Sequence, residues 1–306
     1  MMKRKYKLYG LTIETEVELM QLEKESDRST TDVYIKEEKC ADEVIEYLTK
    51  SGSIEAKYEI GLNYSCFMNK GGYYVIRDGK EILFETKEGY TPKSLSSWIL
   101  GFAFSMLLLQ RETLAIHCSA VCRGDENGKR KAILISGEPG AGKSSLTKKL
   151  IEDGYKIMAD DIAAVSCGDN YVVYPAFPYQ KLVRNEVEKR GLNKDKLIYI
   201  NEDKDKFLVP AGDDFCSEPC EIKCMVFIVV SDVQEVKVRQ LTGLEQLMAL
   251  RANLFLHKLN GAWENLPEVL NMCLRVAGKC PVYLVMRPNG IDSVPAMADF
   301  VKNIDP

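Results

Sequence analysis

The sequence predicts an α/β protein with two unequal parts: a small β-rich α+β domain over residues 1–90 and a larger α/β domain over residues 91–306. Two patterns favour this class. Up to about residue 90, short β-rich runs alternate with turn signals, whereas from about residue 131 strand, loop and helix patterns follow one another. Strands that alternate with helices are typical of a sheet covered by helices. A length of 306 residues suits one large domain or two unequal ones.

Composition and charge exclude several classes of protein. Hydrophobic residues make up 46% and charged residues 28%, which are ordinary globular values and argue against a disordered or collagen-like chain. The 41 Lys and Arg residues are balanced by 45 Asp and Glu residues, for a net charge of −4. The chain therefore has no general excess of positive charge with which to neutralise a nucleic-acid backbone. We expect no nucleic-acid partner.

The cysteines and the apolar segments bear on the cellular compartment. Ten cysteines are spread along the chain, and residues 1–6 carry positive charge without the apolar run of a signal peptide. Reduced thiols in a cytoplasmic protein fit this pattern. The longest apolar stretch, residues 98–109, is shorter than the roughly 20 residues needed to cross a bilayer. We therefore expect a buried helix there, and no membrane association.

The first 90 residues predict a mainly antiparallel β unit with one or two helices. Asp78-Gly79 lies between two β-rich runs and is a strong signal for a hairpin. Residues 40–50 place acidic and apolar side chains at helical spacing and predict a helix. The expected strands cover residues 5–9, 12–17, 32–35, 58–62, 73–77 and 81–85. No pattern that carries chemistry is found in this part.

The remaining residues predict helices and strands in alternation. A helix over residues 93–109 begins next to Pro92, and a strand over residues 113–121 follows it. A helix over residues 143–152 ends before Gly154. The other expected strands cover residues 131–136, 155–159, 162–166, 171–174, 223–230, 235–241 and 282–286, and the other expected helices cover 243–256 and 263–276.

Residues 137–144 form a glycine-rich motif between an expected strand and an expected helix. They read Gly-Glu-Pro-Gly-Ala-Gly-Lys-Ser and match the pattern Gly-x-x-x-x-Gly-Lys-Ser/Thr of phosphate-binding loops. Glycines let the backbone curl so that successive N–H groups point at phosphate oxygens, and the following helix adds its positive N-terminal end. Lys143 supplies a charge for the β- and γ-phosphates, and Ser144 a hydroxyl for Mg²⁺. We assign nucleotide binding to Gly137, Glu138, Pro139, Gly140, Ala141, Gly142, Lys143, Ser144 and Ser145.

A carboxylate pair follows this motif, and a histidine precedes it. Asp160-Asp161 closes the expected strand over residues 155–159, about one helix after the loop, where an acid can face the γ-phosphate. A kinase needs one group to orient the acceptor alcohol and take its proton, and another to bind Mg²⁺. The two Asp residues can fill these roles in either order; a solvated turn is the alternative. For His117, which lies among apolar residues, a structural core histidine is the alternative to a functional one.

Three motifs agree in order and spacing with a known family. The segment His117-Cys-Ser-Ala-Val, the loop over residues 137–144 and the segment Gly154-Tyr-Lys-Ile-Met-Ala-Asp-Asp resemble the catalytic domain of the bacterial HPr kinase/phosphorylase family. Its shorter relatives include kinases of lasso-peptide precursors. The resemblance is close over about residues 113–185. It implies a P-loop kinase fold similar to that of phosphoenolpyruvate carboxykinases.

The resemblance also implies roles for single residues. Asp160 would be the catalytic base, with His117 holding it in place, and Asp161 and Ser144 would lie near Mg²⁺. Lys143 would act on the transferred phosphate. Members of the family tend to assemble, so the resemblance also implies a homo-oligomer.

Two lysines and three cysteines complete the candidates. In the shorter relatives a lysine follows the Asp pair by a short strand and a loop, so Lys181 and Lys206 are candidates for gripping phosphate or substrate. Solvated surface lysines are the alternative. Cys216, Cys220 and Cys224, at C-x3-C-x3-C spacing, are a candidate metal site that lacks a fourth ligand at standard zinc spacing.

Together these patterns predict an ATP- and Mg²⁺-dependent kinase that transfers the γ-phosphate to a serine hydroxyl of a peptide or protein. A kinase of free serine is one alternative. A nucleotide-gated binding module that switches partners without phosphate transfer is another. A GTP-driven switch would carry Asn-Lys-x-Asp, and residues 193–196 read Asn-Lys-Asp-Lys, which departs from that motif at its last position.

Overall fold

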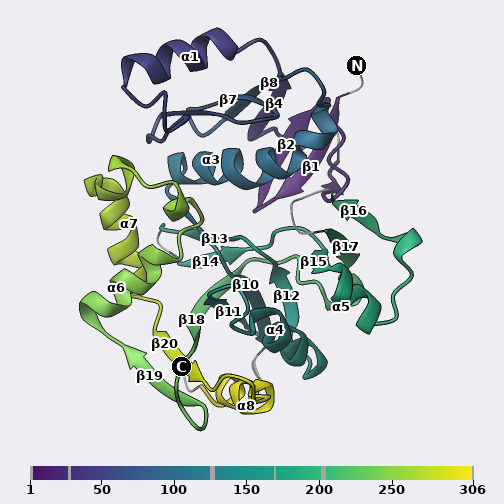
Figure 1. Ribbon diagram of the computed structural model, residues 1–306, viewed down its shortest axis with the longest axis vertical. Coiled ribbons are helices and arrows are strands. Elements are labelled where there is room, and N and C mark those ends of the chain that lie inside the picture. The colour runs from purple at the N-terminus through teal and green to yellow at the C-terminus, as the bar shows by residue number, and fades with distance from the viewer. Residues whose placement is uncertain (1–2, 27–28, 125–127, 169, 201–204, 305–306) are drawn as a thin grey trace. The chain divides into compact units, whose positions relative to one another are not determined.

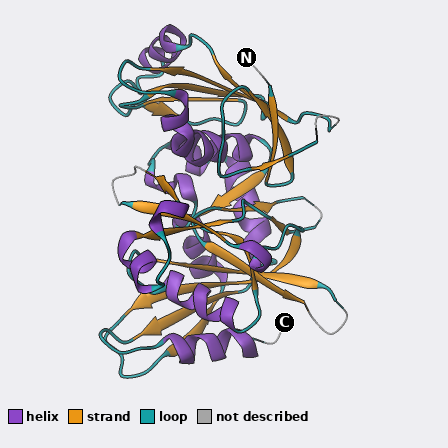
Figure 2. Cartoon of the chain, turned by 90° about the vertical axis from the view of Figure 1, so that its right-hand side faces the viewer, coloured by secondary structure: helices purple, strands orange, loops and turns teal. Residues whose placement is uncertain are grey.

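The computed structural model describes residues 3–26, 29–124, 128–168, 170–200 and 205–304, which form a mixed α/β structure with several sheets and flanking helices (Figure 1, Figure 2). The chain divides into two compact units. The first unit consists of Met1–Ile116, Ala164–Tyr171 and Leu250–Lys279, and the second of His117–Ala163, Val172–Ala249 and Cys280–Pro306. Each unit consists of three separate segments, so this division does not test a single boundary at residue 90, which stays a prediction.

An eight-stranded sheet forms the larger part of the first unit. Its strands lie in the order β3-β1-β2-β4-β8-β7-β6-β5. The pairs β2–β4 and β4–β8 are parallel and the others antiparallel, so the sheet is mainly antiparallel. The strands are β1 (Arg4–Leu8), β2 (Leu11–Thr15), β3 (Glu23–Lys24), β4 (Val33–Glu37), β5 (Tyr58–Glu59), β6 (Tyr64–Met68), β7 (Gly72–Arg77) and β8 (Glu81–Thr86).

The hairpin and the helix predicted in this part are both present. Residues 78–80 join β7 to β8, and Asp78 and Gly79 have φ of 57° and 59°, the positive values of a type I′ turn. Helix α1 (Ala41–Lys50) buries Val44 and Leu48, which lie four residues apart on one face. These two side chains pack on hydrophobic residues of β6, β7 and β8, so the helix is fixed to the sheet by its apolar stripe.

A continuous helical segment, Pro92–Gln110, follows the sheet. It consists of η1 (Pro92–Leu95), α2 (Ser96–Trp98), a π-helical turn η2 (Ile99–Ala103) and α3 (Phe104–Gln110). Reciprocal hydrogen bonds between Thr91 and Ser94 cap its start, which lies next to Pro92 as the sequence predicts. By length and composition this segment could cross a membrane, but 61% of its most apolar window is buried inside the protein, as in a core helix.

The rest of the first unit is mainly helical. It contains the strand β9 (Thr113–Ile116), most of β13 (Ala163–Ser166), the turns η5 (Phe255–Lys258) and η6 (Ala262–Asn265), and helix α7 (Pro267–Ala277). Helix α6 (Gly243–Ala252) precedes η5.

The central strands of the second unit lie in the order β12 (Lys156–Ala159), β10 (Ser119–Gly124), β11 (Arg130–Gly137) and β18 (Cys220–Val230). Strand β10 is antiparallel to both of its neighbours, so β11 and β12 run in the same direction and end at the same edge. Strand β18 is parallel to β11 and to β20 (Val282–Arg287). The strands β19 (Lys237–Leu241) and β14 (Val172–Tyr174) pair with β20 and with the start of β18, respectively.

Two helices, α4 (Lys143–Glu152) and α8 (Val294–Asn303), pack on each other and on this sheet (Figure 1). Their buried residues, Leu146 and Leu150 from α4 and Met297 and Val301 from α8, join the valines and isoleucines of β10, β11 and β18 in one hydrophobic core. Helix α8 was not predicted from the sequence. Its Pro295 lies in the first turn, where proline is tolerated although it otherwise signals a break.

Three short strands between residues 179 and 210 form a small sheet of their own. In this sheet β17 (Lys206–Pro210) lies between β15 (Tyr179–Val183) and β16 (Ile198–Ile200). Along the chain, helix α5 (Arg184–Lys189) and the turn η3 (Lys194–Lys196) connect β15 to β16. The turn η4 (Gly212–Asp214) follows β17. This sheet sets the backbone positions of Lys181 and Lys206.

Candidate active site

The loop between β11 and α4 adopts a backbone shape that its glycines permit. Gly137, Gly140 and Gly142 have φ of 144°, 81° and 104°, a region that favours glycine. A Cβ atom on Gly137 would lie 2.3 Å from the carbonyl oxygen of Ile228 on β18. The chain enters helix α4 at Lys143. The strand, loop and helix expected around residues 137–144 are thus present in that order.

Replacing Gly137 by alanine should destabilise the fold far more than the same change at Gly140. The added methyl group of Gly137→Ala meets β18 backbone that cannot yield without disturbing the sheet, so we expect a loss of about 3 kcal/mol or more. Among the described residues other than its two neighbours in the chain, none has an atom within 4 Å of a Cβ at Gly140, where only the backbone strain of about 1 kcal/mol applies. Urea unfolding of both variants measures the difference, and equal losses would contradict it.

Two cations hold the carbonyl groups of this loop. The Nζ of Lys143 donates to the carbonyl oxygens of Gly137 (2.6 Å) and Glu138 (3.0 Å). Arg287, the last residue of β20, donates from Nε to Ala141 (2.8 Å) and from Nη2 to Gly140 (3.1 Å). Sequence reasoning missed Arg287, because it lies 146 residues from Ala141 and no local pattern links the two.

The carboxylate pair leaves the sheet beside this loop. Strand β10 separates β11 from β12, with Ser119 opposite Ile135 and Ala120 opposite Ala159. The ends of β11 and β12 therefore lie two strand spacings apart, about 10 Å. Residues 137–144 and Asp160-Asp161, which follow these two ends, meet at one edge of the sheet.

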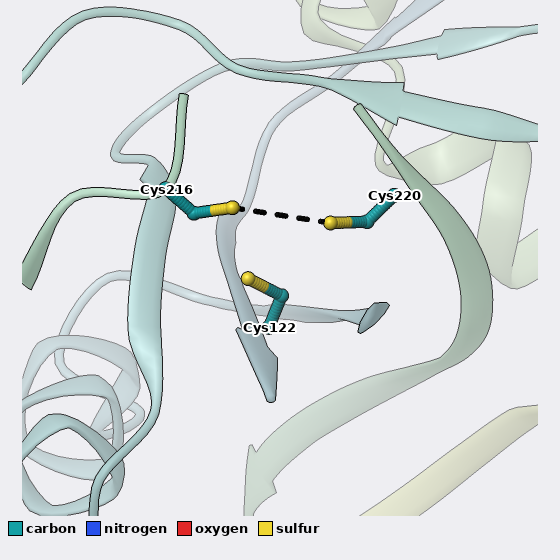
Figure 3. A group of neighbouring side chains, drawn as sticks. All are labelled: Cys122, Cys216 and Cys220. Atoms are coloured by element: carbon teal, nitrogen blue, oxygen red, sulfur yellow. Dashed lines mark hydrogen bonds between the residues drawn. The ribbon is translucent and has the colours of Figure 1, made fainter. Parts of the chain in front are cut away.

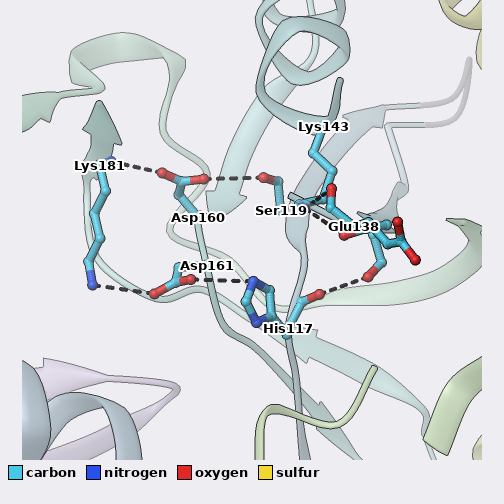
Figure 4. Close-up of polar contacts among 9 residues, drawn as sticks. His117, Ser119, Glu138, Lys143, Asp160, Asp161 and Lys181 are labelled. Atoms are coloured by element: carbon cyan, nitrogen blue, oxygen red, sulfur yellow. Dashed lines mark hydrogen bonds and ion pairs between the residues drawn. The ribbon is translucent and has the colours of Figure 1, made fainter. Parts of the chain in front are cut away.

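Asp160 is held from two sides. Its Oδ1 accepts a hydrogen bond from the hydroxyl of Ser119 (3.2 Å), and its Oδ2 accepts one from the backbone N–H of Lys181 (2.8 Å) (Figure 4). Ser119 was not singled out in the sequence, although it lies only two residues after His117. These bonds fix the orientation of the carboxyl group at the edge of the sheet.

Asp161 forms a second row of contacts beside the first (Figure 4). Its carboxylate lies 3.3 Å from the Nζ of Lys181 and 3.7 Å from the Nε2 of His117. The residue has a φ of 85°, which is costly for a side chain other than glycine and is tolerated where surrounding contacts hold it. The contact of His117 is thus with Asp161, whereas the family resemblance implied a contact with Asp160.

The two adjacent carboxyl groups have opposite pKa shifts. Burial raises the pKa of Asp160 above its ordinary value, and the neighbouring charge of Asp161 acts in the same direction. Burial also acts to raise the pKa of Asp161, but the charges of Lys181, His117 and Lys206 outweigh it and hold that pKa below its ordinary value. Asp160 is therefore the better proton acceptor, and Asp161 the better permanent anion.

The other predicted residues lie on the same loop or beside it. Glu138, Pro139, Ser144 and Ser145 are exposed, whereas Ala141 is buried in the hydrophobic core under the loop. Lys181 and Lys206 come from the neighbouring strands β15 and β17, and both bring positive charge to Asp161.

The cysteine group predicted from C-x3-C-x3-C spacing is wrong in one member. Cys216 and Cys220 lie together, but the third sulfur within reach is that of Cys122 on β10. Cys224 belongs to the hydrophobic core with Val226 and Ile228. Regular alternation would put Cys220 and Cys224 on the same face of β18, but the register with β11 shifts between Ile222 and Cys224, so that Lys223 is an extra residue and the two cysteines lie on opposite faces. No spacing in the sequence indicates this irregularity.

Comparison with known proteins finds a likeness only among solved structures. No protein-family model matches the chain, and neither does any curated protein sequence. Among solved structures, the Hpr(Ser) kinase/phosphatase from Coxiella burnetii is similar with a TM-score of 0.32 and 14% sequence identity, over 62% of this chain and 88% of that chain. Such a distant likeness carries no conclusion about activity, so the function proposed below depends on the contacts within this chain.

Proposed function

We propose that the protein is a kinase that transfers the γ-phosphate of ATP to a serine hydroxyl of a peptide or protein. One observation carries the proposal: the glycine loop with Lys143 and the Asp160-Asp161 pair leave the same edge of one sheet. Phosphate transfer needs a cradle for the donor and a carboxylate for the acceptor within reach of each other. This edge brings both kinds of group together.

The loop supports nucleotide binding through its backbone and its cation. The carbonyl groups of residues 137, 138, 140 and 141 are taken up by Lys143 and Arg287. The first turn of α4 follows at once and offers backbone N–H groups and the positive end of its dipole to an anion. In this proposal Lys143 turns to the β- and γ-phosphates when nucleotide is bound, and the arginine keeps the loop in shape.

The side chains at this edge also fit a magnesium ion. Asp161 has a lowered pKa and a side chain that is 30% exposed, and Ser144 is exposed on the first turn of α4. Both are hard oxygen donors, which suit Mg²⁺ better than a soft metal. We infer that these two residues would hold the ion. When bound, Mg²⁺ neutralises charge that develops on the transferred phosphate.

Asp160 is assigned as the group that orients the acceptor hydroxyl and takes its proton. Its raised pKa makes it a better base than its neighbour, and Ser119 with the Lys181 N–H keeps one orientation of the carboxylate. His117 and the Lys181 ammonium act on the pair from the other side by holding Asp161. A cytoplasmic location and a homo-oligomer stay predictions.

The experiment is a transfer assay with isotopically labelled ATP and Mg²⁺ in a bacterial lysate. Phosphoserine on a peptide or protein, detected by mass spectrometry and absent without the added enzyme, would support the proposal. Phosphoserine formed only as the free amino acid would favour the small-molecule alternative. Slow ATP hydrolysis with no phosphorylated acceptor would contradict a kinase and favour a nucleotide-gated binding module.

A further inference from the structure

Three thiols converge in the second unit, away from the glycine loop and the carboxylate pair. Cys122 lies on β10, Cys216 follows the turn η4, and Cys220 begins β18 (Figure 3). Their Sγ atoms all lie within 4.8 Å of one another, and those of Cys216 and Cys220 are 4.0 Å apart. Segments that are distant in sequence thus bring three soft donors to one point.

The three thiols are buried next to one another and next to a cation. The three residues are at most 2% exposed, and none forms a disulfide. The guanidinium of Arg130 lies 3.8 Å from the sulfur of Cys216, so a positive charge is already present beside the group.

The separation of the Cys216 and Cys220 sulfurs is close to that of a metal centre, and the third sulfur lies within 4.8 Å of both. Zinc binds thiolate sulfur at about 2.3 Å, and two sulfurs in a tetrahedral site therefore lie about 3.8 Å apart. The observed 4.0 Å between Cys216 and Cys220 is close to that value. A disulfide would need a separation of about 2 Å. The third thiol and the arginine have no part in a disulfide, whereas a metal centre uses both.

We propose that Cys122, Cys216 and Cys220 bind one Zn²⁺ ion. Three thiolates and Zn²⁺ leave one negative charge, which Arg130 balances. The thiols of Cys216 and Cys220 donate hydrogen bonds to the carbonyl oxygen of Glu218, at 3.6 Å and 3.5 Å, in an exposed turn. Zinc would replace the two thiol protons, and an oxygen from this turn or from water would complete the tetrahedron. The ion fastens β10 to the start of β18.

This site is independent of the proposed phosphate transfer, and its test is binding rather than activity. Metal-free, reduced protein is titrated with Zn²⁺ against a chromophoric chelator, and with Co²⁺, whose thiolate charge-transfer absorption reports bound sulfur. We expect one ion per chain, the cobalt absorption, and a melting temperature that rises with Zn²⁺ and falls back with chelator.

Cys220→Ser and Cys224→Ser are the matched variants, because both cysteines are buried on β18 and only the first belongs to the group. Cys220→Ser should bind Zn²⁺ at least about 100-fold more weakly, and Cys224→Ser as tightly as the wild type. If Cys220→Ser does not fold, as judged by circular dichroism without metal, Cys122→Ser replaces it. Equal affinity of the matched variants, no binding by the wild type, or a Cys216–Cys220 disulfide in the purified protein would overturn the proposal.

Discussion

Asp160→Asn should slow phosphate transfer strongly while leaving nucleotide binding intact. The amide keeps the shape of the side chain and can still accept hydrogen bonds from Ser119 or from the Lys181 N–H, but it cannot take a proton. General-base catalysis contributes on the order of 10²–10⁴-fold, so kcat should fall by that factor. Labelled transfer gives kcat, and a fluorescent ATP analogue gives the affinity of the variant. Transfer at the wild-type rate would remove Asp160 from the role of base.

The pH dependence of the wild-type enzyme supplies an independent check. Burial raises the pKa of Asp160, and the base must be deprotonated to act, so the rate should decline on the acid side at a pH above the ordinary range of an Asp. The hydroxyl of Ser119 opposes that shift. Ser119→Ala should therefore move the acid limb to still higher pH, and an unchanged limb would argue that another group controls it.

Lys143→Ala should weaken both nucleotide binding and transfer. Its ammonium bridges two loop carbonyl groups, and the proposal gives it a charge-assisted contact with the terminal phosphates. We expect the affinity for ATP to fall about tenfold or more and kcat to fall on the order of 10²-fold, because a charge aimed at the transferred group acts most strongly in the transition state. Titration calorimetry and the transfer assay separate the two effects.

Lys148→Ala is the matched control for this variant. Lys148 lies on the same helix, with a side chain 47% exposed and an ion pair to Glu152 at 3.8 Å. Its removal should leave affinity and rate within a factor of about two, since exposed ion pairs contribute little. A similar loss in both variants would mean that general charge on α4, rather than the position of Lys143, supports binding. Melting temperatures exclude a folding defect as the cause.

The sequence was most informative where neighbouring residues alone determine a local structure. Residues 137–144 contain the glycines, the lysine and the serine of the loop, and the apolar runs on either side indicate the strand and the helix. The turn at Asp78-Gly79 and the apolar face of α1 were predictable for the same reason, because neighbouring residues determine both the backbone conformation of a turn and the periodic apolar face of a helix. Helix α8 was not predicted, because the proline in its first turn resembles a helix-breaking signal.

The sequence by itself determined the chemistry that is available: a phosphate loop, an adjacent carboxylate pair, a histidine before the loop and a set of cysteines. Only the tertiary structure decided which of these groups meet. Arg287 reaches the loop, Ser119 holds Asp160, and Cys122 rather than Cys224 joins Cys216 and Cys220. The order of the strands sets each of these contacts, and strand order depends on packing between distant segments, which no local pattern of residues encodes.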